Sequence, residues 1–142
     1  MKLHYIFICL VAVMVTSQVS CGRSSIAFET DTNGGVIAGS STLDGTEYRI
    51  ALRTGDFANQ PKWNPAESEV PLTAHEACLL AEKEVTKATG LDGWTVSTIK
   101  LDRNQYDSNV WYYSLEFSHR RGLLIVVVLL DGTVIMPKPA KD

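Results

Sequence analysis

The segment LLIVVVLL, residues 123–130, decides the fold of this chain. It contains eight apolar residues in a row, half of them β-branched, between Arg120-Arg121-Gly122 and Asp131-Gly132. Because the residues pointing to either side are all apolar, the run predicts a β-strand that is buried on both faces. It is too short to cross a bilayer as a helix, which takes about 20 residues.

A strand of this kind needs a cover on each face. Leaving one set of four side chains in water would expose on the order of 400 Å² of apolar surface, or about 10 kcal/mol at 25 cal/mol per Å². That is comparable to the stability of a whole domain. A single helix covers only one face. We therefore expect the second face to be covered either by an N-terminal hairpin together with Phe57 and Trp63, or by a partner chain.

The segments on either side of the run predict three more strands. From 111 to 118, apolar and polar residues alternate strictly, which is typical of a strand with one dry face. In the preceding strand the alternation changes phase between Val96 and Ile99, as a β-bulge requires. Asp131-Gly132 predicts a tight turn into a last short strand at 133–136. These strands together predict a four-stranded antiparallel meander.

A helix precedes the meander. Thr73 and Glu76 have the spacing of a capping box at its start, and Gly90 supplies its end. A narrow face with small side chains, expected to lie close to the sheet, consists of Ala74, Ala77, Cys78, Ala81, Val85 and Ala88.

The first half of the chain predicts a hairpin and a long connection. Segments 36–41 and 47–53 flank Asp44-Gly45, and the second of them alternates apolar and polar residues. Residues 26–28 form a possible further strand. Residues 54–70 contain Gly, Pro and Asn-Pro and predict a loop, either a binding loop or a crossover that lays Phe57 and Trp63 on the sheet. The expected fold class is α+β: one helix packed on a four-stranded antiparallel meander, preceded by an N-terminal β-hairpin.

The beginning of the chain has the layout of an export signal. A basic residue is followed by an apolar run at 5–15 and then by small and polar residues before Cys21, which predicts a signal peptide over residues 1–20. We assign 21–70 to a tether, the hairpin and the loop, and 71–142 to the helix and the sheet. The expected location is outside the cytoplasm: a cell-envelope lipoprotein, or otherwise a secreted or periplasmic protein.

The segment Val19-Ser20-Cys21-Gly22 resembles the lipobox of bacterial lipoproteins, although Gln18 stands where that pattern usually has Leu. The resemblance implies a lipid on Cys21 and, through it, a membrane as partner. Ordinary cleavage after Ser17 or Gly22 and an uncleaved anchor are the alternatives. If Cys21 carries no lipid, a disulfide between Cys21 and Cys78 is a further alternative in an oxidising compartment.

Chemistry-bearing residues are sparse. The net charge is −3 with no basic stripe, which argues against nucleic acid as a partner. His75, Cys78 and His119 are the only grouping that resembles a nucleophile or metal site, and Cys78 lies on the apolar helix face, where a buried thiol is the simpler interpretation. Tyr112, Glu116 and His119 either decorate a ligand-facing surface or form a solvated or half-buried sheet face. We predict no catalytic residues, no metal and no cofactor.

The order of elements resembles the small PepSY and cystatin-like modules of exported bacterial proteins, and more closely a group of short bacterial lipoproteins. The residues that carry the resemblance are Pro71-Leu72-Thr73, Trp111-Tyr112-Tyr113, Phe117 and Asp131-Gly132-Thr133-Val134. They are cap, core and turn residues, so the resemblance implies a fold and no activity. We expect a non-catalytic, exported or membrane-anchored module that binds a protein or envelope component, with a protein partner or a homodimer both open. A protease-regulating module and a small-ligand-binding cone-like domain are the alternatives.

Overall fold

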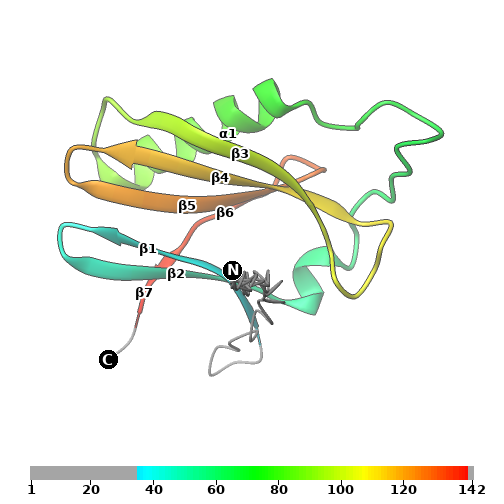
Figure 1. Cartoon of the computed structure of the whole chain (residues 1–142), viewed down its shortest axis with the longest axis horizontal. Helices are drawn as coiled ribbons and strands as arrows, with labels where there is room; N and C mark the ends of the chain where they lie inside the picture. The colour runs from blue at the N-terminus through cyan, green and yellow to red at the C-terminus, as the bar shows by residue number, and fades with distance from the viewer. Residues whose placement is uncertain (1–34, 141–142) are drawn as a thin grey trace, which may run out of the picture.

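The computed structural model describes residues 35–140 and has an α+β fold with one helix packed on a sheet (Figure 1). The elements are β1 (Val36–Leu43), β2 (Thr46–Leu52), the 3-10 helix η1 (Thr54–Phe57), α1 (Ala74–Thr89), β3 (Thr95–Arg103), β4 (Trp111–His119), β5 (Gly122–Leu129), β6 (Val134–Ile135) and β7 (Lys138–Pro139). The expected fold class is confirmed at this level. The predicted signal peptide, Cys21 and the possible strand at 26–28 lie outside the described residues. None of the helices within residues 35–140 is both long and apolar enough to span a membrane.

The strands of the described region form one sheet in the order β3-β4-β5-β1-β2-β7, with β6 paired to β5. β3, β4 and β5 are antiparallel neighbours in chain order, as a meander requires. The predicted fourth strand is reduced to two residues, because β6 pairs only Val134 and Ile135 with β5. The meander is therefore only partly as predicted. The shift expected between Val96 and Ile99 is present as a break in register between Val96 and Thr98.

The N-terminal hairpin is not a separate unit in front of the meander, since it continues the same sheet. β1 lies beside β5, with Leu43 opposite Gly122. A Cβ on Gly122 would overlap the carbonyl oxygen of Thr42, so only glycine permits this approach. The turn of the hairpin is at Asp44-Gly45 as predicted, and both residues have positive φ angles, 51° and 78°, as a type I′ turn requires.

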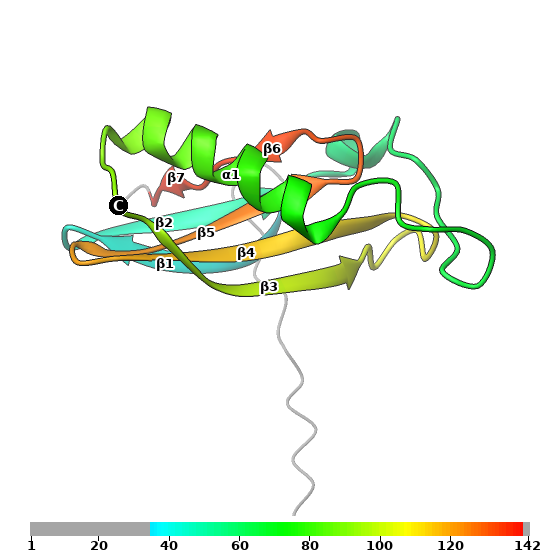
Figure 2. The same ribbon diagram turned by 90° about the horizontal axis from the view of Figure 1, so that it is seen from above.

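β5 is buried on both faces, as its sequence predicts. Its even-numbered residues from Leu124 onward join the core beneath α1, which covers one side of the sheet (Figure 2). On the opposite face, Val127 and Leu129 pack with Ile50 and Leu52 of β2. The hairpin continues the sheet through β1, and it also brings the side chains of β2 against the second face of β5 and covers it. Nearer the start of β5, Leu123 and Ile125 remain half-buried.

The two aromatic rings of the long connection lie on different faces of the sheet. Phe57, at the start of the connection, packs with the second-face cluster, which consists of Ile50, Leu52, Val127 and Leu129. The ring of Phe57 lies 5.9 Å from that of Tyr112. Trp63 instead packs against the core under α1, with its ring 5.4 Å from that of Trp111. The prediction that Trp63 helps cover the second face is wrong, because the chain between these two residues has already passed from the hairpin to the helix side.

The predicted helix start and end are confirmed. The Thr73 hydroxyl accepts a hydrogen bond from the Glu76 amide at 3.3 Å, and the Glu76 carboxylate accepts one from the Thr73 amide at 2.9 Å. Gly90 ends α1 in the left-handed conformation. The predicted buried face is shorter than expected: Ala74 and Ala88 are exposed, because contact with the core is confined to the middle turns, where the fully buried residues are Ala77, Ala81 and Val85.

Candidate binding cavity

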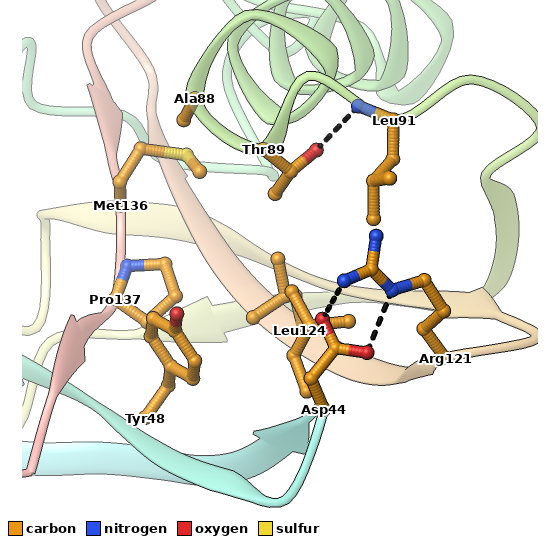
Figure 3. A pocket seen from close by; sticks show the side chains of 10 residues that line it. Asp44, Tyr48, Ala88, Thr89, Leu91, Arg121, Leu124, Met136 and Pro137 are labelled. Carbon is orange, nitrogen blue, oxygen red and sulfur yellow. Dashed lines mark hydrogen bonds and ion pairs between the residues drawn. The ribbon is translucent and has the colours of Figure 1, made fainter.

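A cavity of about 300 Å³ lies where the last turn of α1 meets the β1–β2 and β4–β5 turns (Figure 3). Its lining comes from segments that are distant in sequence. The lining residues are Leu43, Asp44, Tyr48, Ala88, Thr89, Leu91, Arg121, Leu124, Met136 and Pro137. Six of these ten side chains are apolar and the others carry polar groups, so the cavity offers both hydrophobic contact and hydrogen-bonding groups, as ligand sites do.

The end of α1 shapes one wall. Because Gly90 takes a φ of 66°, the chain leaves the helix and brings Leu91 back beside Thr89. The Thr89 hydroxyl donates to the Val85 carbonyl at 2.8 Å and accepts from the Leu91 amide at 3.3 Å. It also accepts from the Trp94 indole at 3.3 Å. The Thr89 side chain is therefore fully used in fixing this wall.

The opposite wall is held by an ion pair between two turns. Arg121 Nε donates to Asp44 Oδ1 at 2.6 Å, and Arg121 Nη2 contacts Asp44 Oδ2. The hydrogen bond from Arg121 and the charge of Asp44 raise the pKa of the Arg121 guanidinium above its usual range. The main chain adds a bond from the Asp44 amide to the Arg121 carbonyl at 3.0 Å. The two turns are thus joined by both side chains and backbone.

Two polar groups of the lining remain available to a ligand. Figure 3 shows that one terminal nitrogen of Arg121 takes no part in the pair with Asp44. The Tyr48 hydroxyl forms no hydrogen bond within residues 35–140. Both groups are donors, since a guanidinium N–H donates and a tyrosine O–H can donate. The cavity is therefore suited to an apolar group that carries a hydrogen-bond acceptor.

The structure does not bring together the His75, Cys78 and His119 grouping. His75 is exposed in the first turn of α1, whereas His119 lies at the end of β4, 5.0 Å from the ring of Trp94. Burial, together with the negative charge of Glu82, raises the pKa of the half-buried Cys78 thiol. A raised pKa disfavours the thiolate that a nucleophile or metal ligand needs. The pairing of Cys78 with Cys21 is not tested, because Cys21 is outside the described residues.

Tyr112, Glu116 and His119 do not form a common surface either. Tyr112 is packed against the second-face cluster, and burial, with a smaller effect of the Asp102 charge, raises the pKa of its phenol. Glu116 accepts a hydrogen bond from the Ser97 hydroxyl at 2.9 Å. His119 points to the helix side of β4, opposite to Tyr112 and Glu116, where its ring is tilted against that of Trp94. Within the described part of the chain, no group of three or more His, Cys, Asp or Glu side chains is placed to hold a metal ion.

Sequence reasoning missed the cavity and treated Asp44 and Arg121 only as turn and flanking residues. A signal was present in their charges, since the two hairpin turns carry residues of opposite sign. These opposite charges could have been interpreted as an ion pair only with the knowledge that β1 lies beside β5. A scan against protein-family models and searches of curated proteins and of solved structures find no match for this chain.

Proposed function

We propose that this chain is a non-catalytic, exported or membrane-anchored module that binds a protein or another envelope component, and that the cavity at the end of α1 receives an apolar side chain of that partner. The observation that carries the proposal is the cavity itself. It joins an apolar floor to two unused donors on Tyr48 and Arg121.

The size of the cavity supports a single inserted group. At about 300 Å³ it has roughly twice the volume of the ~150 Å³ apolar cavity that accommodates one benzene molecule. It also stands at the lower end of the range of small-molecule sites, about 300–1,000 Å³. A tyrosine side chain, presented by a partner, matches this volume, and its hydroxyl can accept a hydrogen bond from Tyr48 or Arg121.

The contacts of the polar lining residues support a binding role for the cavity over a catalytic one. Asp44 is engaged with Arg121, and the Thr89 hydroxyl with three groups of its own helix end. A general base must have its oxygen or nitrogen free to face a substrate proton. In this cavity the Asp44 carboxylate and the Thr89 hydroxyl are committed to keeping its walls in place, and among the polar side chains of the lining only the donors on Tyr48 and Arg121 remain free within the described residues.

The amino-terminal sequence supports the location. The export-signal layout of residues 1–20 and the lipobox-like Val19-Ser20-Cys21-Gly22 favour a protein delivered to the envelope, with a lipid on Cys21 as its membrane anchor. The resemblance to short bacterial lipoproteins with a PepSY-like domain favours the same place. Mass spectrometry of the mature amino terminus tests both, because a diacylated Cys21 and a free residue after Ser17 or Gly22 differ in mass.

The test of binding fills the cavity without touching the core. Ala88 lines the cavity and is exposed, so Ala88→Trp should occupy the space. Lys87→Trp, one residue earlier on an exposed position, is the matched control. In cross-linking pull-downs from envelope extract, the full wild-type chain and Lys87→Trp should retain the same partner and Ala88→Trp should lose it. Equal recovery by all three chains, or nothing above background, would count against the proposal.

The same cavity favours a second candidate, the binding of a free small molecule. Indole, an apolar two-ring compound, is a suitable probe of the apolar part of the cavity. If the cavity receives such groups, indole should raise the melting temperature of the wild-type chain and of Lys87→Trp, but not of Ala88→Trp. Stabilisation by indole combined with no recovered protein partner would favour the small-molecule function over the protein-binding one.

A further inference from the structure

β3 is the outer strand of the sheet, and no strand within residues 35–140 pairs with its outer edge (Figure 1). The direction of its backbone groups follows from one bond: the Asn104 amide donates to the Val110 carbonyl at 2.8 Å, toward β4. Backbone groups alternate in direction along a strand whose register is regular, and the register from Thr98 to Arg103 is unbroken. The amides and carbonyls of Ile99, Leu101 and Arg103 therefore point away from the sheet.

Two side chains of opposite charge flank the middle of this edge. Lys100 and Asp102 are paired with Ser114 and Tyr112 of β4 and so lie on the same face of the sheet, opposite α1. Lys100 is exposed and Asp102 is half-buried. Neither forms an ion pair within residues 35–140. A lysine alone on an edge strand discourages the strand from pairing with a second copy of the same strand. An aspartate two residues away makes such pairing favourable in one particular register, in which the lysine faces the aspartate of the other copy.

We propose that two copies of this chain associate through antiparallel pairing of their β3 edges, centred on Leu101. In that register Leu101 faces Leu101 of the partner copy, and Ile99 faces the partner copy's Arg103. Both are pairs of residues whose backbone groups point outward, so each forms the two hydrogen bonds of an antiparallel pair. Lys100 then stands directly opposite Asp102 of the partner copy, twice over because of the two-fold symmetry.

Charge and local structure select this register over its neighbours. Pairing centred on Lys100 or on Asp102 would place two like charges directly opposite each other, which is destabilising. Pairing centred on Ile99 would bring Leu101 opposite Ser97, where the register of β3 is broken. A register shifted by one residue would place residues whose amides and carbonyls point toward the partner copy opposite residues whose amides and carbonyls point back into the sheet. The hydrogen bonds between the strands could then not form. Pairing centred on Arg103 would place that residue opposite its own copy, again a pair of like charges. Among the registers centred on residues 99–103, only the one centred on Leu101 satisfies both the backbone and the charges.

The side chains on the helix side of the edge add apolar contact. Ile99 is 36% exposed, among the most exposed large apolar side chains of residues 35–140, and Leu101 is half-buried. Pairing would cover both. The guanidinium of Arg103 already lies 4.5 Å over the ring of Trp111, which holds its aliphatic stem in place to face the partner copy's Ile99.

The dimer would leave the cavity open, because β3 contributes none of its lining. Two cavities on one particle would allow bivalent capture of a component that displays the bound group more than once. This consequence depends on the proposed function. The pairing itself does not, so the failure of one leaves the other standing.

The test exchanges the two charges. By sedimentation velocity of the full chain in a density-matched detergent, the wild type should show a concentration-dependent dimer. Lys100→Asp and Asp102→Lys should each raise its dissociation constant by about 10-fold or more, since each replaces two attractive pairs by two repulsive ones. The double variant Lys100→Asp/Asp102→Lys should restore dimerisation. Lys83→Asp, the same change on an exposed position of α1, should have no effect.

Amide hydrogen exchange gives an independent readout. The amides of Ile99, Leu101 and Arg103 should become protected as the concentration of the wild type rises, and should stay unprotected in both single variants. A wild type that sediments as a monomer at every concentration would overturn the proposal. So would single variants that dimerise like the wild type, or a folded double variant that fails to recover.

Discussion

Arg121 Nε donates a 2.6 Å hydrogen bond to Asp44 Oδ1 across 77 residues of sequence, and so joins the turn of the β1–β2 hairpin to that of β4–β5. The side chains are 45% and 43% exposed. Exposed pairs are worth little individually, typically about 0.2–1 kcal/mol. The value of this pair is positional, because it fixes one wall of the cavity.

A double-mutant cycle should measure a small, salt-sensitive coupling at this pair. Asp44→Asn keeps a residue that tolerates the positive φ of the turn and removes the charge. Combined with Arg121→Gln, it should give a coupling of about 0.5–1 kcal/mol in urea unfolding, falling at high salt. Arg120→Gln, at the neighbouring exposed position, is the control and should not couple to Asp44→Asn. A coupling that does not change with salt would contradict an ion pair.

Gly122→Ala should be among the most damaging single substitutions. The added methyl group would overlap the Thr42 backbone, and the φ of 146° is one that other residues rarely adopt. We expect a loss of about 3 kcal/mol or more in the free energy of unfolding, since β1 must move away from β5. Gly55→Ala is the control, because it has open space around it, and should cost less than about 0.5 kcal/mol. Similar costs for the two would mean that β1 and β5 are not this close.

Leu129→Ala tests whether the side chains on the second face of β5 are packed as tightly as a hydrophobic core. Leu129 is 1% exposed and packs with Ile50, Leu52 and Val127. Removing a buried leucine side chain costs about 2–5 kcal/mol, and the same loss is expected in urea unfolding here. Leu79→Ala is the matched control, since Leu79 on α1 is 53% exposed, and should change stability by less than about 0.5 kcal/mol. A cost below about 1 kcal/mol for Leu129→Ala would show that the hairpin does not seal this face.

Local features were predictable because neighbouring residues determine them. The box formed by Thr73 and Glu76, the turn at Asp44-Gly45 and the break after Val96 each follow from residues within a few positions of one another. The two-sided burial of 123–130 was also predictable, since hydrophobic content alone requires it.

The placement of the hairpin and the cavity was not predictable, because both depend on distant contacts. A hairpin with one apolar face can lie across a sheet or extend it, and the choice rests on the close approach at Gly122. Trp63 is apolar wherever it lies, so its sequence position does not say which face it joins. The cavity combines the end of α1 with Leu124 and Met136, which no local pattern connects.

The capping box of α1 predicts a specific dependence of stability on acid. Hydrogen bonds from the Thr73 amide and hydroxyl to the Glu76 carboxylate lower its pKa below the ordinary value of 4.5. Folding therefore favours the ionised form. The contribution is fully present above the unfolded pKa and is lost as the pH falls through the lowered folded pKa.

Unfolding midpoints by circular dichroism between about pH 3 and pH 7 should show this as a difference between two variants. Glu76→Gln should lose the part of the acid sensitivity that comes from the cap, whereas Glu82→Gln, on the same helix, should keep that part. Both variants should keep the sensitivity due to Asp131, whose pKa is also lowered, because the opposite effect of burial is outweighed by hydrogen bonds from Thr133 and Gln60. Thr73→Ala should cost about 0.5–2 kcal/mol at neutral pH and remove only the smaller part of the pH dependence, since it takes away the hydroxyl but keeps the backbone amide, which lowers the pKa of Glu76 most. Identical pH profiles for Glu76→Gln and Glu82→Gln would show that the carboxylate of Glu76 does not cap α1 in solution.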